Sequence, residues 1–551
     1  MTATEIRGVG VGRLVATGPL IRMPEPLPEP ARDERHDGDA AAEKARVAAA
    51  FAAVGADLTA RAAQAGGEGA AVLEAAAMMA QDPMLADDVN RRIDGGTGAE
   101  RAVFEGFASF QDQLTALGGY LAERATDLAD VAQRIIAHLR GVAAPGVPSS
   151  PTPFILVARD LAPADTALLD LTKVLGLVTS DGGPTSHTAI LARSKSIPAI
   201  VGATGVLDLA DGTALVLDAE AGVVTVAPSA EQIAEAQRRI AERAAQAAAP
   251  ITDGALADGT KVPLLANVGS PADGAEAVAL GAEGVGLFRT EFLFLGENDA
   301  PSVESQQTQY TELLRHFPGK KVVVRVLDAG ADKPLAFLND AHEENPALGL
   351  RGLRALRASE QVLRDQLTAL KGAQDATDAD LWVMAPMVAD EHETAYFVDY
   401  ARGLGLHTVG VMAEVPSLAV LADQVLQVAD FVSVGTNDLT QYTLAADRML
   451  GSVASYQDPW HPAVLRLVKL LGDAGAATGK PVGICGEAAA DPQLAVVLVG
   501  LGATTLSMTP AALADVRAEL AAVTLGQARA RAAAALAAPG AAEAREAARL
   551  A

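Results

Sequence analysis

Eight short apolar runs recur through the second half of the chain, each followed by a stretch with helical periodicity. They lie between Val262 and Met508 and read VPLLANV, GVGLFRTE, VVVRVLD, LWVMAPMV, VGVMAEVP, FVSVGTND, PVGICGE and TTLSM. Continuous apolar strands separated by helices are typical of a parallel sheet. Eight such units in about 250 residues predict a C-terminal (β/α)8 TIM barrel over residues 251–525. A doubly wound open sheet is the alternative.

The first half of the chain follows a different pattern. Residues 1–25 and 145–228 contain short strand-like runs, whereas residues 30–144 have helical periodicity. We therefore predict a multidomain α/β protein in which the two strand-rich segments form one β/α domain and the helical block is an inserted subdomain. Residues 229–250 predict a charged linker helix. The alanine-rich tail, residues 526–551, is expected to be helical or frayed.

Composition limits the class of protein. At 551 residues the chain exceeds the size of one hydrophobic core. Its net charge of −26 disfavours nucleic acid as a partner, because nucleic-acid binders usually carry a basic face. The single cysteine, Cys485, excludes an internal disulfide framework and fits a reducing compartment. We see no signal peptide and no apolar stretch long enough to span a membrane, so we expect a cytoplasmic protein.

Polar residues follow the apolar runs where each predicted strand ends. In a (β/α)8 barrel the functional groups lie at the carboxyl ends of the strands. Any one of these residues could simply belong to a polar loop, but the set predicts a ligand site. Its members are Asn267, Arg289, Thr290, Glu291, Arg325, Asp328, Glu414, Asn437, Asp438, Cys485 and Glu487.

The charges in this set indicate the kind of ligand. Arg289, Arg325 and the nearby Arg448 carry the planar guanidinium that suits carboxylate and phosphate oxygens. Glu414 and Asp438 are two carboxylates, which together with a substrate phosphate are what Mg²⁺ usually binds. These residues predict a small phosphorylated acid bound with Mg²⁺. The alternative is that the carboxylates form salt bridges with the same arginines.

Cys485 has two possible roles. A lone cysteine is usually a small buried hydrophobic residue. A thiol at the rim of a barrel could instead donate or accept a proton.

The segment SDGGPTSHTAILARSKSIPAIVG, residues 180–202, places a histidine behind a glycine loop. Thr185 and Ser186 are suitable N-caps, and the helical pattern begins at His187. A helix N-terminus accommodates phosphate, so an imidazole there could accept a phosphoryl group as a covalent intermediate. The residues alone leave equally open that His187 only caps or packs the helix.

The segment GGPTSHTAILAR resembles the phosphohistidine signature of the phosphoenolpyruvate-utilising enzymes. The segments GVGLFRTEFLFL, VRVLDAGADKP, NPALGLRGLR, VMAEVPS, VSVGTNDLTQYTLAADR, DPWHPAVL and GICGEAAAD resemble the barrel motifs of that family, in the same order. Within the family, the layout resembles the enzyme I group of the sugar phosphotransferase system. In that group a helical subdomain interrupts the phosphohistidine domain and docks a histidine-containing phosphocarrier protein (HPr).

The resemblance implies a role for each candidate residue. His187 takes the phosphoryl group from phosphoenolpyruvate (PEP) and passes it to HPr, the first step of sugar uptake. Cys485 protonates the enolate of the departing pyruvate. Two further positions, Lys333 and Arg351, fall in matching motifs with less certain roles. The substrate-binding residues implied are Arg289, Arg325, Asn437, Asp438 and Arg448, and the Mg²⁺ ligands are Glu414 and Asp438. The family also implies a homodimer through the barrel.

Two alternative functions stay open. A pyruvate-phosphate dikinase or PEP synthase would add a large nucleotide-binding domain, for which the chain before Asp181 leaves no room. A non-catalytic regulatory scaffold of the same fold would predict a gap in the set of site residues, and every position is filled.

Under this resemblance His187 must reach both the substrate in the barrel and the carrier on the helical block, which implies that its domain moves. We expect the phosphohistidine domain to swivel about linkers near Pro145–Pro153 and residues 229–250. In the helical block, Met78, Met79 and Met84 could form an adaptable docking patch, or could equally be core residues of their helices.

Overall fold

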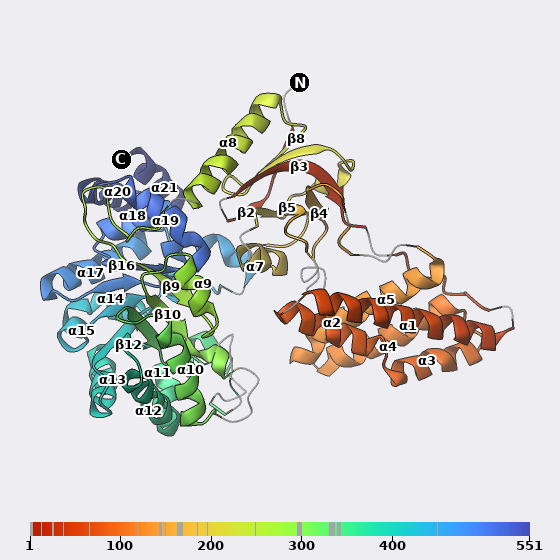
Figure 1. Ribbon diagram of the computed structural model, residues 1–551, viewed down its shortest axis with the longest axis horizontal. Helices are drawn as coiled ribbons and strands as arrows, with labels where there is room; N and C mark the ends of the chain where they lie inside the picture. The colour runs from red at the N-terminus through yellow and green to blue at the C-terminus, as the bar shows by residue number, and fades with distance from the viewer. Residues whose placement is uncertain are drawn as a thin grey trace. The chain divides into compact units, whose positions relative to one another are not determined.

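The protein is described from a computed structural model, in which the chain divides into two compact units, Met1–Glu242 and Arg243–Ala551 (Figure 1). Each unit is considered by itself. The described residues are 4–12, 14–24, 27–36, 38–65, 67–117, 119–142, 146–148, 150–161, 169–183, 186–194, 197–247, 250–294, 300–329, 335, 337–338, 343–448 and 450–551.

The first unit contains an eight-stranded mixed sheet in the order β1-β8-β7-β3-β4-β5-β6-β2. Its two sequence segments meet where β3 pairs in parallel with β4, with Leu20 opposite Ile155. The two strand-rich segments therefore do share one sheet. The strands are β1 (Thr4–Arg7), β2 (Val9–Val11), β3 (Val15–Arg22), β4 (Phe154–Ala158), β5 (Val174–Thr179), β6 (Ala199–Val201), β7 (Ala214–Asp218) and β8 (Val223–Val226).

The helical block lies between β3 and β4 in the sequence and has its own hydrophobic core. Leu58, Val89 and Ile135 are fully buried in it. The rings of Phe51 and Phe107 meet edge to face with centroids 5.8 Å apart. The helices are α1 (Ala40–Ala65), α2 (Gly67–Met79), α3 (Pro83–Asp94), α4 (Ala99–Leu117) and α5 (Gly119–Arg140).

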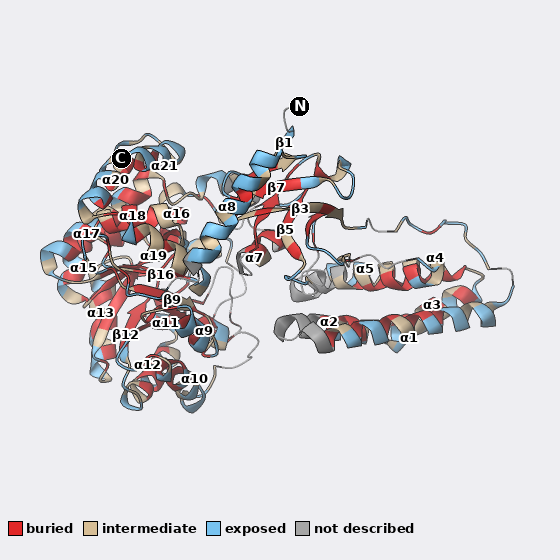
Figure 2. Ribbon diagram, turned by 45° about the horizontal axis from the view of Figure 1, so that its top comes forward, coloured by how far each residue is buried: buried red, intermediate tan, exposed pale blue. Residues whose placement is uncertain are grey.

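The second unit is a closed barrel of eight parallel strands, so the TIM-barrel prediction is confirmed and the open sheet is wrong. The barrel closes where β16 pairs with β9, with Leu506 opposite Leu264. Figure 2 shows the barrel strands coloured almost entirely as buried. The strands are β9 (Leu264–Val268), β10 (Val285–Arg289), β11 (Lys321–Arg325), β12 (Asp380–Ala385), β13 (Thr408–Ala413), β14 (Val432–Val434), β15 (Val482–Ile484) and β16 (Thr505–Met508).

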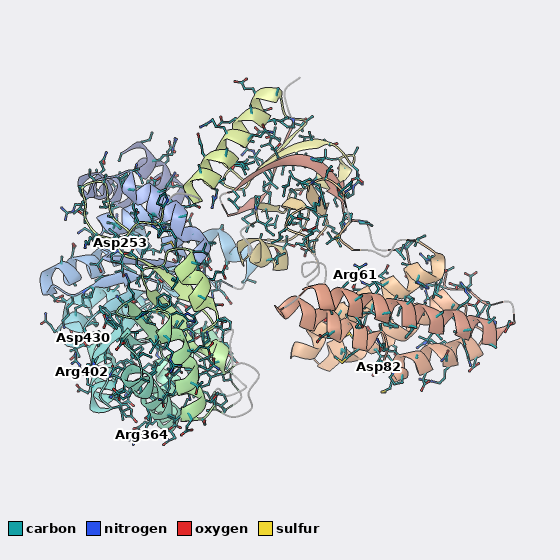
Figure 3. The ribbon with its side chains drawn as sticks, viewed as in Figure 1. Arg61, Asp82, Asp253, Arg364, Arg402 and Asp430 are labelled. Atoms are coloured by element: carbon teal, nitrogen blue, oxygen red, sulfur yellow. The ribbon has the colours of Figure 1, made fainter. Side chains whose placement is uncertain are left out.

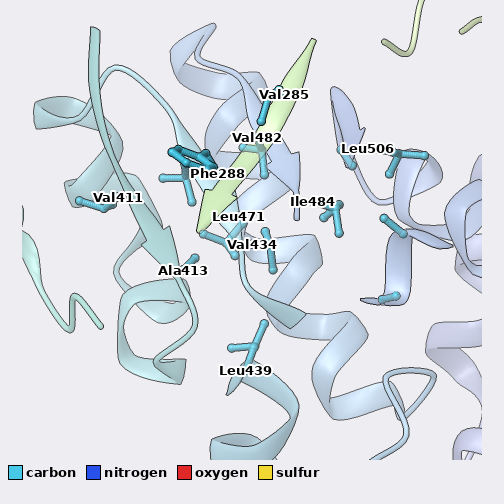
Figure 4. Close-up of a cluster of buried hydrophobic side chains, with 14 of the residues drawn as sticks. Val285, Phe288, Val411, Ala413, Val434, Leu439, Leu471, Val482, Ile484 and Leu506 are labelled. Atoms are coloured by element: carbon cyan, nitrogen blue, oxygen red, sulfur yellow. The ribbon is translucent and has the colours of Figure 1, made fainter. Parts of the chain in front are cut away.

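Helices surround the barrel and bury its outer face. Figure 4 shows strand residues Val434 and Ile484 in the same apolar cluster as Leu439 and Leu471 from the helices. Charged side chains such as Arg402 and Asp430 form ion pairs on the exposed side (Figure 3). The helices are α9 (Asp273–Ala279), α10 (Val303–Arg315), α11 (Leu353–Ala358), α12 (Glu360–Asp375), α13 (Glu391–Gly403), α14 (Pro416–Val420), α15 (Ala422–Val428), α16 (Thr436–Leu444), α17 (Pro462–Thr478), α18 (Pro492–Gly500) and α19 (Leu513–Ala521).

The expected linker helix and alanine-rich tail are both helical. The linker helix is α8 (Ala230–Ala247), and the tail forms α20 (Leu525–Ala537) and α21 (Ala541–Leu550). Helix α20 packs so closely on α18 that a Cβ at Gly500 would lie 2.1 Å from the Ala528 carbonyl oxygen. Among the described residues, no helix is both long enough and apolar enough to cross a membrane.

Candidate active site

The predicted rim residues gather at the carboxyl end of the barrel because the strands are parallel. Arg289 ends β10 and Arg325 ends β11, and their Cα atoms are register partners. Glu414 directly follows β13, and Cys485 directly follows β15. Asp438 lies in the first turn of α16, after β14. Five of the eight strands, β10, β11, β13, β14 and β15, thus present ionisable side chains at one end of the barrel.

Arg325 is already paired with two carboxylates of the protein. Its Nη2 donates to Glu291 Oε1 at 2.5 Å, and its Nη1 lies 3.2 Å from Asp328 Oδ2. Burial by itself disfavours the charge on Arg325, but these two carboxylates more than offset that effect and raise the pKa of Arg325 above its ordinary value. Arg325 is therefore a fixed positive charge held in one orientation.

Arg351 links two other parts of the rim. Its Nη2 donates to Asp328 Oδ2 at 3.0 Å, and its Nη1 donates to Asp438 Oδ1 at 3.2 Å and to the Tyr442 hydroxyl at 3.1 Å. Only 2% of Arg351 is exposed. The role of Arg351 was uncertain from the sequence. In the structure it forms ion pairs that connect the loop after β11 to helix α16.

Arg289 differs from both. Within the part of the chain that the structure describes, its guanidinium makes no hydrogen bond and no ion pair. Burial, and next the positive charge of Arg325, lower the pKa of Arg289. The protein has therefore placed a cation at the rim beside a second cation. An anionic ligand would supply the missing partner.

Glu414 is a buried carboxylate whose two oxygens differ in their hydrogen bonding. Its Oε1 accepts a hydrogen bond from the Met387 backbone N–H at 2.7 Å, whereas Oε2 accepts none from the described residues. Burial, and next the negative charges of Asp328 and Asp438, raise the pKa of Glu414 to about 8. A Cβ at position 435 would lie 2.9 Å from Oε2, so Gly435 leaves this oxygen room.

This arrangement fits a divalent cation. Like-charged carboxylates that repel one another are stabilised by a shared cation, and Mg²⁺ binds through one or two carboxylates plus substrate oxygens and water. Glu414 and Asp438 would supply those carboxylates. The described residues contain no group of three or more metal-type side chains at binding geometry, so the substrate would have to complete the site. The salt-bridge alternative applies to Asp438, which also lies 3.6 Å from Arg448, but not to Glu414.

Asn437 and Cys485 lie at the ends of neighbouring strands. Asn437 Oδ1 accepts from the Glu487 N–H at 3.2 Å, which leaves its Nδ2 without a partner among the described residues. The Cys485 thiol donates to the Val434 carbonyl at 3.4 Å and packs in the apolar interior of the barrel beside Met412. Burial, and next the Glu414 carboxylate, raise the pKa of Cys485 to about 12, so the thiol keeps its proton.

The histidine segment forms the predicted loop and helix. Helix α7 (His187–Ser194) begins at His187, as expected. Gly182 adopts a φ of +91°, which favours glycine. The Ser186 hydroxyl caps the helix by accepting from the Ala189 N–H at 3.3 Å. The side chain of His187, and the whole of Lys333, lie outside the described residues.

Gln366 was not singled out from the sequence. It lies on α12 among buried leucines at positions 363, 367 and 370 and is itself 0% exposed. Its side chain forms hydrogen bonds with the Leu327 N–H and the Thr290 hydroxyl, next to the charged residues of the rim. A glutamine on the apolar face of an amphipathic helix is the pattern that could have revealed it.

The helical block presents a second surface of interest. Met78 and Met84 are 69% and 67% exposed, whereas Met79 packs against the core, so the core alternative is correct for Met79 alone. Asp82 caps α3 by accepting from the Met84 and Leu85 N–H groups (Figure 3). The helical block also contains a groove of about 300 Å³, lined by Val47, Ala48, Phe51, Ala52, Ala80, Gln81, Ala86 and Asn90.

Comparison with known proteins extends these observations. The family description "PEP-utilising enzyme, PEP-binding domain" matches residues 241–525, "mobile domain" matches 150–222 and "N-terminal" matches 7–124. Phosphoenolpyruvate-protein phosphotransferase of Streptomyces coelicolor is 55% identical over 526 residues, 95% of each chain. The protein of that name from Haloferax volcanii is 40% identical over 550 residues, 96% of each chain.

A solved solution structure of Enzyme I is 30% identical and aligns with 43% of this chain and 99% of its own, with a TM-score of 0.40. The family assignment rests on the sequence matches, since one domain description alone spans about half of the chain and the relatives align over nearly its whole length. The chain belongs to the phosphoenolpyruvate-utilising enzymes, in the group of the phosphoenolpyruvate-protein phosphotransferases, or enzyme I.

Proposed function

We propose that this enzyme transfers a phosphoryl group from PEP to its own His187 and then to a histidine of HPr, releasing pyruvate as the first step of sugar uptake. The observation that carries the proposal is Arg289. Arg289 is a half-buried guanidinium with no hydrogen-bond or ion-pair partner among the described residues, and next to Arg325 it would suit a small dianionic or trianionic ligand.

The chemistry of the rim suits PEP in particular. Arg289, Arg448 and the Asn437 amide offer donors for the phosphate and carboxylate oxygens, and Arg325 adds a fixed positive charge. Glu414 and Asp438 would hold Mg²⁺, which supplies charge neutralisation on the phosphoryl oxygens when bound. The site thus contains charges of both signs, as a metal-bound phosphorylated acid requires.

The reaction balances with the residues available. A neutral imidazole nitrogen of His187 attacks phosphorus, the bond from phosphorus to the enol oxygen breaks, and the electron pair leaves with the enolate of pyruvate. The enolate then takes a proton on its methylene carbon. Cys485 is the proposed donor, because its raised pKa keeps the thiol protonated until a carbanion is close, and solvent then reprotonates the thiolate.

HPr would dock on the helical block. The exposed Met78 and Met84 offer an adaptable apolar surface on this block, and the exposed Asp87 would attract a basic partner. The division into a phosphohistidine domain (1–25 and 145–228), an inserted carrier-binding subdomain (30–144), a linker, a PEP-binding barrel and a tail is part of the proposal. So is the swivelling of the phosphohistidine domain between barrel and HPr.

The proposal also includes a cytoplasmic homodimer that associates through the barrel. Sedimentation of the full chain against residues 251–551, at micromolar concentrations, tests this part. If both the full chain and residues 251–551 sediment as monomers, the proposed dimer is wrong, whereas the proposed phosphoryl transfer is unaffected.

Radiolabelled PEP tests the proposed transfer. We expect ³²P from PEP to label the wild type in the presence of Mg²⁺, and adding HPr to move the label to the carrier. The variant His187→Ala should take up no label. His392→Ala is the matched control, because the His392 side chain is 94% exposed and remote from the site in sequence. Absence of label on the wild type, or equal labelling of His187→Ala, overturns the proposal.

A further inference from the structure

A fully buried polar network lies behind the rim, between the barrel strands and helices α10 and α12. Its centre is Gln366, and the other members are Thr290, Tyr310 and Gln306, all between 0% and 2% exposed. Buried polar groups are costly unless each is hydrogen-bonded, so a network of this kind needs a reason to exist.

Every hydrogen bond in the network has a consistent direction. Gln366 Oε1 accepts from the Leu327 N–H at 2.9 Å, and its Nε2 donates to Thr290 Oγ1 and to the Tyr310 hydroxyl, both at 3.1 Å. Thr290 then donates to the Arg325 carbonyl at 3.0 Å, and Tyr310 donates to Gln306 Oε1 at 3.1 Å. Only an amide offers the acceptor and the two donors that this position uses.

The network holds the backbone next to the charged residues. Thr290 lies between Arg289 and Glu291, and Leu327 lies between Arg325 and Asp328 in the chain. One Gln366 side chain therefore ties together the segments that follow β10 and β11. Since Arg289 and Arg325 are register partners of like charge, their repulsion tends to separate these two strand ends.

We propose that Gln366 is a positioning residue that fixes the spacing of Arg289 and Arg325 for the phosphorylated substrate. The inference rests on the proposed function. Gln366 touches no substrate itself and acts through Thr290 and the Leu327 N–H. A purely structural role would show as lost stability, whereas a positioning role also weakens binding of PEP.

Calorimetric titration of PEP with Mg²⁺ into full-length His187→Ala protein separates the two roles, because this background binds without reacting. Adding Gln366→Met, which keeps the volume and removes the three hydrogen bonds, should raise the PEP Kd at least tenfold. Gln361→Met is the matched control, since Gln361 lies on the same helix, is exposed, and among the described residues its side chain hydrogen-bonds only to Asp365. It should leave the Kd within twofold.

A second set of variants tests the proposal independently, in case Gln366→Met does not fold. Thr290→Val removes the hydroxyl at nearly constant shape, and Thr290→Ser keeps it, so Ser should bind PEP more tightly than Val by at least fivefold. Tyr310→Phe breaks the branch of the network that leads away from the strands. It should lower the unfolding temperature while changing the Kd less than Thr290→Val does.

The outcomes distinguish the two proposals. If the His187→Ala parent binds no PEP, the proposed function fails, and the positioning role fails with it. If the parent binds and both Gln366→Met and Thr290→Val leave the Kd unchanged, only the positioning role is overturned. Equal Kd values for Thr290→Ser and Thr290→Val would overturn it as well.

Discussion

The two neighbouring arginines at the rim should differ in how much stability the protein loses when each is replaced by methionine. Arg325→Met removes the cation that lies 2.5 Å from buried Glu291 and 3.2 Å from Asp328. Taking one partner from a buried ion pair costs about 3–5 kcal/mol of unfolding free energy. Arg289→Met removes a cation whose pKa is lowered by burial and which has no ion-pair partner among the described residues. Its loss should cost less than about 1 kcal/mol.

Differential scanning calorimetry of the full chain, without PEP or Mg²⁺, measures this difference. At about 2 °C per kcal/mol for a unit of this size, Arg325→Met should lower the barrel transition by roughly 6–10 °C. Arg289→Met should shift it by less than about 2 °C. The barrel transition is identified as the one that PEP with Mg²⁺ raises in the wild type. Both variants should nevertheless lose PEP binding.

An exposed pair calibrates the measurement. Arg402→Met removes the partner of Asp430 on the outside of the barrel (Figure 3), and surface pairs contribute about 0–1 kcal/mol. If Arg289→Met destabilises the barrel as much as Arg325→Met does, then Arg289 is a structural cation. The observation on which the proposed function depends would then be refuted.

Three further outcomes are expected. In EDTA, Glu414→Gln should be more stable than the wild type by up to about 4 kcal/mol at pH 8 and nearly as stable as the wild type at pH 5. The reason is that the raised pKa of Glu414 makes its ionisation in the folded state costly only above its ordinary value of 4.5. A stability difference that stays constant from pH 5 to 9 in thermal unfolding would contradict this. Cys485→Ser should phosphorylate His187 but release pyruvate at least tenfold more slowly, as followed by a lactate dehydrogenase coupled assay, and an unchanged rate would exclude the thiol as the proton donor. Asp82→Ala should lower the stability of the helical block by about 1 kcal/mol through loss of the α3 cap, visible in circular dichroism, while labelling from PEP stays at the wild-type level.

The fold was largely accessible from the sequence because each element has a strong local pattern. Each of the eight apolar runs between Val262 and Met508 overlaps a barrel strand, since buried parallel strands are mostly continuous apolar runs. Ser186 caps α7 as its hydroxyl and position suggest. The insertion of the helical block also followed from pattern alone.

The site was accessible only in outline. The sequence places Arg289 and Arg325 at the rim, but it cannot tell that one is neutralised by Glu291 and the other has no partner among the described residues, because that depends on side-chain geometry across strands. Gln366 and Arg351 form hydrogen bonds with residues far away in the chain, which the sequence does not reveal. Met79 and Met78 are adjacent, and only the rotation of α2 decides which of them is exposed.

The parallel pairing of β3 with β4 has a consequence for how the chain can diversify. Parallel neighbours cannot be joined by a tight hairpin, and the crossover between them needs about a dozen residues. Here residues 23–153 make that crossover, which is far longer than the connection needs to be. The pairing of β3 with β4 therefore does not depend on which side chains the helices expose. The surface of this helical insertion can therefore change without loss of the sheet, and under the proposed function a redesigned insertion would direct the phosphoryl group to a different carrier while the barrel stays the same.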